Sequence, residues 1–301
     1  MYYKHSGRFT LGGLVVAGLV GCVAALILAY AYGVGIIHIP EVKLAAIAAV
    51  AFGCLVGVAV GYGLVWGKVR NDLAGSLLSA GVSALALYVS WAVWVASTLE
   101  SQNVQKISWV DAALQPGALW NAICMINKYG TWSFSSGPAT AGGFLWFIWF
   151  LEAACVIGVG AFVGLAVLQA HTFCETCGIW CKRGAKLMLA PPSDVAQLKL
   201  QLEANDLRTL ESLGPGAKGT DHLDVALNSC EQCCQFHTMS VVHTMIRRSK
   251  TGKLQVTNHT IVKHLLLGPG HAETLRQHSE KVSQAAKIAA PMAKGAAAAK
   301  Q

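Results

Sequence analysis

Six cysteines in the second half of the chain have a spacing that indicates metal or thiol chemistry. They form two clusters, Cys174/Cys177/Cys181 and Cys230/Cys233/Cys234. Each cluster contains a Cys-x-x-Cys pair, whose two-residue spacer allows a tight turn with backbone N–H groups pointing at sulfur. Two such pairs can supply the four thiolates of a tetrahedral Zn²⁺ shell, with Zn–S bonds of about 2.3 Å. The first expectation is therefore a metal site built from two distant turns.

The surroundings of the two pairs resemble a zinc ribbon. Gly178 directly follows the first pair, where a metal-binding turn favours a positive φ. The second pair lies between strand-like segments 223–227 and 239–246, and a third strand is expected over 254–262. The resemblance covers residues 171–267. It implies a structural Zn²⁺ ion held by one cysteine quartet, Cys174, Cys177, Cys230 and Cys233.

The chain departs from the simplest zinc ribbon in two ways. A long insert follows Cys177, and Asp194 with Gln197 can cap a helix in it, expected over 194–213. Surplus residues near the pairs are additional or alternative ligands: Cys181, Cys234, His171 and His237. Two alternatives to structural zinc therefore stay open. One is an iron–sulfur cluster, although neither standard ferredoxin spacing is present, and the other is thiol redox chemistry.

The first 170 residues supply the elements that carry this site. Hydrophobic residues make up 54% of the chain and charged residues 13%, against about a quarter charged in soluble domains, which excludes a wholly soluble or a disordered protein. About 20 apolar residues cross a bilayer. Four stretches have that length: 11–37, 44–66, 73–98 and 144–170. We expect a membrane all-α domain, a four-helix transmembrane bundle over 1–170, plus a small cytoplasmic α+β zinc-ribbon-like domain over 171–267.

Basic residues near the ends of the stretches predict the orientation. They gather on one side of the membrane: Lys4, Arg8, Lys68, Arg70, Lys182, Arg183 and Lys186. Because such residues favour the cytoplasm, both termini are expected there, in an integral protein of the bacterial inner (plasma) membrane. An alternative makes the first stretch a signal peptide cleaved near residues 29–31. In either case the cysteine-containing half faces the reducing cytosol, which disfavours disulfides.

Small residues recur at every fourth position in three of the stretches. The first two contain Gly13, Ala17, Gly21, Ala25, Gly53, Gly57 and Gly61. The fourth contains the pairs Ala154/Gly158 and Gly160/Gly164. Small residues at this spacing let helix backbones approach closely in lipid. The pattern predicts tight packing within the bundle, with a homo-oligomer formed through an exposed stripe as the alternative.

Two further features lie in the membrane half. The loop 99–143 is expected to be helical and to lie in the membrane surface, with a helix starting at Pro116, ending at Gly130 and anchored by Trp120, Tyr129 and Trp132. Two alternatives are that it caps the bundle or contacts a partner. Glu152 is the one acidic residue inside the four stretches. A carboxyl group inside a membrane is a functional candidate by default. A structural or protonated Glu152 is the leading interpretation, and a role in transport is the alternative.

The remaining sequence bears on function. We expect no enzyme, because no phosphate-binding, dinucleotide-binding or nucleophile-elbow motif is present. Residues 268–301 are rich in Ala and Lys and are expected to form a flexible tail. A turn between two strands contains a basic cluster: Arg247, Arg248, Lys250 and Lys253.

These features predict a multi-pass membrane protein that presents a structural-zinc module at the cytoplasmic face as a protein-docking or assembly platform. Its expected partners are the lipid bilayer and another protein. Three alternatives remain: a membrane-tethered zinc ribbon that binds nucleic acid, a transporter or channel subunit that uses Glu152, and a thiol redox sensor that uses Cys181 or Cys234.

Overall fold

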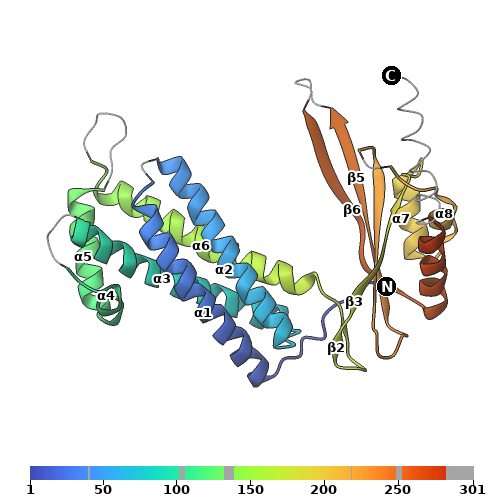
Figure 1. The fold of residues 1–301 in the computed structure, drawn as a ribbon, viewed down its shortest axis with the longest axis horizontal. Helices are drawn as coiled ribbons and strands as arrows, with labels where there is room; N and C mark the ends of the chain where they lie inside the picture. Colours follow the sequence, from blue (N-terminus) through green and yellow to red (C-terminus); the bar gives the residue numbers. More distant parts are fainter. Residues whose placement is uncertain (40, 102–105, 132–138, 218, 249–252, 283–301) are drawn as a thin grey trace, which may run out of the picture. The chain divides into compact units, whose positions relative to one another are not determined.

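The structure of the 301-residue chain is a computed structural model with two compact units (Figure 1). It describes residues 1–39, 41–101, 106–131, 139–217, 219–248 and 253–282. The helical unit is His5–His171, and the sheet unit combines Thr172–Gln301 with Met1–Lys4. The break at residue 171 agrees with the composition of the sequence. The assignment of Met1–Lys4 to the sheet unit had no sequence signal.

Four helices of the helical unit are long and apolar enough to span a membrane. They are α1 (Leu11–Ile36), α2 (Val42–Trp66), α3 (Asp72–Ser101) and α6 (Gly142–Gln169). The Thr10 side chain caps α1 by accepting a hydrogen bond from the Gly13 N–H group at 3.0 Å. Asn71 does the same for α3, accepting from Ala74 at 2.8 Å. Helices α1 and α3 therefore begin where a polar capping residue precedes the apolar run.

The small residues of α1 and α2 lie at helix crossings within this one chain. All seven that the stripes contain are buried: Gly13, Ala17, Gly21, Ala25, Gly53, Gly57 and Gly61. A Cβ atom added to Gly57 would lie 2.6 Å from the carbonyl oxygen of Gly160 in α6. One added to Gly21 would lie 2.9 Å from a methyl group of Val60 in α2. Close backbone approach is thus used for packing inside the bundle.

The stripe predicted on α6 is only half correct. Gly160 and Gly164 are buried, but Ala154 and Gly158 are exposed. The reason is the helical repeat, because positions 158 and 160 are two residues apart and so lie about 200° apart around the helix axis. The two pairs cannot share one face, and the contacts with α2 and α3 select Gly160 and Gly164.

The loop 99–143 contains two helices, α4 (Trp109–Leu114) and α5 (Pro116–Tyr129). Leu119 and Ile123 of α5 are buried in a cluster with residues of α3 and α6, so α5 packs on one end of the bundle. Trp120 is more than half exposed, and its ring centroid lies 5.2 Å from that of Trp146 in α6. Trp132, the third predicted anchor, lies outside the described residues.

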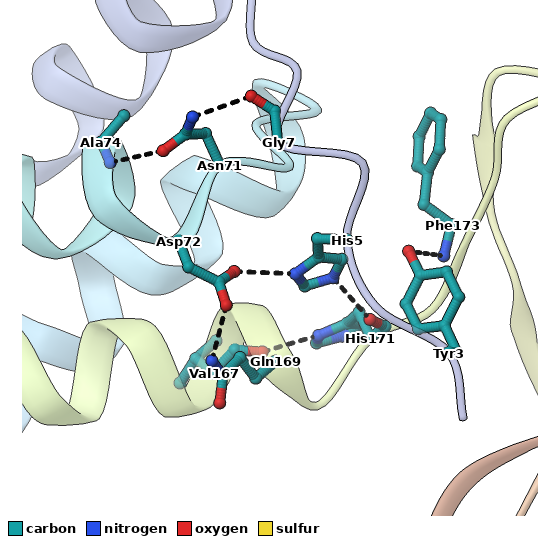
Figure 2. Close-up of polar contacts among 10 residues, drawn as sticks. All are labelled: Tyr3, His5, Gly7, Asn71, Asp72, Ala74, Val167, Gln169, His171 and Phe173. Atoms are coloured by element: carbon teal, nitrogen blue, oxygen red, sulfur yellow. Dashed lines mark hydrogen bonds and ion pairs between the residues drawn. The ribbon is translucent and has the colours of Figure 1, made fainter. Parts of the chain in front are cut away.

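Polar side chains connect three segments of the helical unit at the other end of the bundle (Figure 2). His5 Nδ1 lies 2.9 Å from Asp72 Oδ1 at the start of α3, and His5 Nε2 lies 3.1 Å from the His171 carbonyl oxygen. Gln169 of α6 donates from Nε2 to Asp72 Oδ2 at 2.8 Å. Asp72 thus ties the segment before α1 to the end of α6.

The sheet unit is an antiparallel meander covered by helices on one face (Figure 1). The strands, in spatial order, are β3 (Lys182–Leu189), β4 (His222–Ser229), β5 (His237–Arg248) and β6 (Leu254–Leu267). Alternation along β4 places Leu223, Val225 and Leu227 in the core. The predicted strands correspond to β4, β5 and β6, whereas β3 is an additional strand.

The insert forms two helices, α7 (Val195–Glu203) and α8 (Arg208–Ser212), in place of the single helix predicted over 194–213. Asp194 caps α7 by accepting from the N–H groups of Ala196 and Gln197 at 2.8 and 3.0 Å. The break between the helices is at Asn205, which has a φ of 59° and so takes the left-handed conformation that Asn tolerates.

Part of the predicted flexible tail belongs to the fold. Residues 269–282 form a helix, and its Ala272 and Leu275 are 1% and 0% exposed in the same core as α7 and α8. Two buried apolar residues in a polar, Ala-rich segment are a weak signal, and for this reason the sequence suggested a tail. Residues 283–301 lie outside the described part of the chain.

Candidate metal centre

Two hairpin turns bring the four cysteines of the Cys-x-x-Cys pairs together. Strands β1 (Phe173–Cys174) and β2 (Ile179–Trp180) form a small antiparallel pair whose turn contains Cys177. The turn between β4 and β5 contains Cys230 and Cys233. The Sγ atoms of all four cysteines lie within 4.8 Å of one another. This cysteine quartet can hold a metal ion.

The distance between the sulfur atoms fits tetrahedral coordination of a metal ion. Four sulfur atoms about 2.3 Å from a central ion stand roughly 3.8 Å apart, and the Sγ atoms of Cys174 and Cys233 are 3.8 Å apart. A disulfide would need a separation of about 2.05 Å. Cys174 and Cys230 are buried and the other two ligands are partly exposed, so the site lies just below the surface.

The two turns share one backbone conformation. In the first, the Gly178 N–H group donates to the Cys174 carbonyl at 2.9 Å, and Gly178 has a φ of 67°. In the second, the Cys234 N–H group donates to the Cys230 carbonyl at 3.2 Å, and Cys234 has a φ of 52°. Cys234 therefore occupies the position that Gly178 occupies in the first turn. Its role is in the turn, and its side chain is exposed rather than in the quartet.

The electrostatics of the quartet favour a thiolate at Cys233 and disfavour one at Cys174 and Cys177 unless a cation is bound. Hydrogen bonds from the backbone N–H groups of Gln235 and Phe236 lower the pKa of Cys233 to about 6. Burial raises the pKa of Cys174, and burial together with the neighbouring sulfur atoms raises the pKa of Cys177 to about 12. Several negative sulfurs this close repel one another, so a divalent cation must compensate them before all four ionise.

The surplus cysteines lie outside the quartet. Burial raises the pKa of Cys181 to about 11, which keeps it in the thiol form at neutral pH. Cys234 points its sulfur toward the Glu231 carbonyl oxygen, 3.7 Å away. Neither thiol is among the four sulfurs that lie within 4.8 Å of one another.

The surplus histidines are engaged elsewhere. His237 places Nδ1 2.9 Å from Ser229 Oγ and Nε2 3.0 Å from the Cys234 carbonyl oxygen, and its burial lowers its pKa. Both of its nitrogens therefore have hydrogen-bond partners. His171 belongs to the helical unit, where its Nδ1 lies 2.9 Å from the Val167 carbonyl oxygen.

Sequence reasoning missed Tyr3, which contacts residues beside both cysteine-containing turns. Its hydroxyl accepts a hydrogen bond from the Phe173 N–H group at 3.0 Å (Figure 2). Its ring lies edge-on to Phe236 beside the second turn, with centroids 5.7 Å apart. The Tyr3 N–H group also donates to the His264 carbonyl of β6 at 2.8 Å. No sequence signal connects residue 3 with turns 170 and more residues away.

Substitutions at Cys234 and Gly178 test whether these two positions play the same role in their turns. We expect Cys234→Gly to keep the full metal content and to stabilise the metal-loaded sheet unit by about 1 kcal/mol, because a side chain is disfavoured at positive φ. Gly178→Ala is the matched reverse change, since a Cβ there meets no atom within 4 Å and only the backbone conformation opposes it. Urea unfolding monitored by circular dichroism measures both. Loss of metal from Cys234→Gly would contradict the assignment.

Comparisons with known proteins do not assign the chain to a family. The chain matches no protein-family model, no curated protein and no solved structure. The cysteine quartet and the surfaces of the two units therefore carry the functional inference.

Proposed function

We propose that this protein is a membrane-anchored docking platform, in which a structural Zn²⁺ ion stabilises a sheet unit that binds an extended segment of another protein. The four apolar helices provide the anchor. The basic residues beside the ends of these helices support a cytoplasmic position for the sheet unit. The observation that carries the docking function is the exposed outer edge of strand β6.

The donor set supports zinc in a structural role. Four thiolates at tetrahedral spacing form a closed shell, which leaves no position for a water molecule that could be activated. The ion would join the turn after β1 to the turn after β4, two segments about 50 residues apart in the chain. This arrangement favours folding of a presented surface over hydrolysis.

Strand β6 is an edge strand that the chain itself already extends in part. The Leu266 N–H group donates to the Met1 carbonyl at 3.0 Å, and Tyr2 pairs with Leu265 in an antiparallel bridge. Residues 254–260 of the same strand are exposed at every position. Within the described residues, nothing but β5 pairs with this part of β6. The N-terminal segment thus shows how a short strand adds to this edge.

The chemistry of the open edge indicates its partner. Free edges of sheets bind extended peptides through backbone hydrogen bonds, with side-chain pockets giving specificity. Leu254 and Val256 are 62% and 58% exposed there, and Arg247 and Arg248 at the end of β5 are exposed as well. An extended segment with apolar and acidic residues matches this surface. Lys250 of the predicted basic cluster lies outside the described residues.

Site-specific photo-crosslinking tests the proposal in cells that produce the protein natively. A photoreactive phenylalanine derivative at Val256 of the full chain should give one discrete protein adduct. The same group at Leu200, which is 68% exposed on α7, is the control and should give none. Thr257→Pro should reduce the Val256 adduct about tenfold, because proline disrupts strand pairing.

Three outcomes would overturn docking at this edge. In the first, the photoreactive group gives the same amount of protein adduct at position 256 as at position 200. In the second, nuclease treatment removes the adduct at position 256. In the third, the group at position 256 crosslinks only to lipid. A nuclease-sensitive adduct would instead favour the nucleic-acid-binding alternative.

A further inference from the structure

The helical unit contains a cavity of about 1390 Å³ between α1, α2, α3, α5 and α6, at the end of the bundle where α5 packs. This volume exceeds the roughly 300–1,000 Å³ of most small-molecule sites. Most of its lining is aliphatic or aromatic. A cavity of this size can therefore hold a ligand with several rings.

Glu152 of α6 is the polar centre of the cavity wall. Its Oε1 accepts a hydrogen bond from the Tyr32 hydroxyl at 2.6 Å, and the Tyr32 ring stacks on Phe52 with centroids 4.5 Å apart. Tyr32 is the one hydrogen-bond partner that Glu152 has among the described residues. The stacked tyrosine orients the carboxyl group, and Oε2 keeps its capacity to accept from a ligand.

Three tryptophans line the same cavity as Glu152. Trp149 lies one turn before Glu152 on α6, and its ring centroid is 4.9 Å from Trp91 and 6.2 Å from Trp94 of α3. The three rings pack edge to face, with interplanar angles of 70° to 83°. Indole faces are the strongest aromatic partners for cations.

The charged groups of the cavity have one sign. Its described lining includes two carboxyl groups, Glu152 and the exposed Glu41 at the start of α2, and no Lys, Arg or His. No cationic side chain of this described lining can pair with an anion. A metal ion is also a poor match, because the described residues form no group of three or more potential metal ligands besides the cysteine quartet.

We propose that this cavity binds amphiphilic organic cations, such as aryl or alkyl ammonium and phosphonium compounds. The carboxyl group of Glu152 provides the charge partner, the indoles provide cation–π contacts, and the aliphatic walls accept the apolar substituents. Burying a carboxyl group in an apolar membrane site costs free energy, and a bound cation would offset that cost by pairing with the carboxylate. This site is independent of the docking surface, because it lies wholly within the helical unit.

The test compares two ions of nearly the same shape and opposite charge on the full chain in lipid nanodiscs. Saturable binding of tetraphenylphosphonium and of tetraphenylborate is measured by equilibrium dialysis against empty nanodiscs. The wild-type protein should bind the cation at least about tenfold more tightly than the anion. Equal binding of the two ions, or no saturable binding of the cation, would overturn the proposal without any variant.

Two variants then locate the charge. Glu152→Gln should weaken cation binding at least about tenfold and leave the metal content of the sheet unit unchanged. Asp111→Asn is the matched control, because it removes an exposed carboxyl group of α4 that does not line the cavity, and it should change cation binding less than about threefold. Unchanged cation binding by a folded Glu152→Gln variant would show that another group holds the charge and would overturn the assignment.

Discussion

Removal of the metal ion is expected to lower the unfolding temperature of the sheet unit by at least about 20 °C. Structural zinc contributes about 10 kcal/mol or more in small domains that fold only with metal, and each kcal/mol shifts the unfolding temperature of a domain of this size by several degrees. A bound ion would join two turns whose residues are not part of the leucine-rich core cluster. The quartet ligands Cys174 and Cys177 therefore depend on it more than the core residue Leu202 does.

Elemental analysis and calorimetry measure this effect on the full chain. The purified protein should contain one zinc per chain, and a zinc-selective chelator should remove both the metal and the high-temperature transition. Hydrogen exchange should then increase first at 173–181 and 230–236, while α1–α3 and α6 keep their protection. Cys177→Ser should reproduce the loss, and Cys234→Ser, which changes a cysteine outside the quartet, should not. Stoichiometric iron, or unchanged unfolding after metal removal, would refute structural zinc.

The cysteine quartet was predictable from the sequence because each half of it depends on local spacing. A Cys-x-x-Cys pair forms its turn with its own backbone, as the hydrogen bond from Gly178 to Cys174 shows. Only the meeting of the two turns is long-range, and the requirement of four thiolates for one ion supplied that step. The apolar stretches were predictable for a similar reason, since length and composition alone indicate a span.

The features that escaped prediction depend on partners distant in sequence. Strand β3 begins with Lys182 and Arg183 and has an irregular register between Arg183 and Lys186, so it has little of the alternation that marks a strand. Tyr3 acquires its role only when β6 and the residues beside both cysteine-containing turns surround it. Such positions are defined by tertiary contacts, and no local pattern encodes them.

Glu152 shows how far a single residue can be interpreted from sequence. Its position inside an apolar stretch marked it as a candidate, but a lone acid does not define a site. Tyr32 from α1 and the tryptophans of α3 and α6 complete the surroundings, and these residues come from three separate helices. The ligand class follows from that combination of charge and aromatic rings, which the order of residues in the chain does not reveal.

The crossing of α6 with α2 and α3 permits a comparison of two glycines on one helix. A Cβ atom on Gly160 would collide with the Ser83 hydroxyl and lie 3.0 Å from Ser83 Cβ of α3, and the carbonyl of Gly160 already stands 2.6 Å from a Cβ position on Gly57. A Cβ on Gly158 would meet no atom within 4 Å. Because both residues lie in the same apolar helix, differences in membrane insertion between their variants are small.

Gly160→Leu is therefore expected to destabilise the bundle by at least about 3 kcal/mol, because α6 must move away from two neighbouring helices to accept the side chain. Gly160→Ala should have a smaller effect of the same sign, while Gly158→Leu should stay within about 0.5 kcal/mol of the wild-type protein. Unfolding in detergent, followed by tryptophan fluorescence and by the yield of monodisperse protein, measures all three. Equal stability of the two leucine variants would mean that α6 does not pack through Gly160, and that the small-residue stripes serve contacts between chains instead.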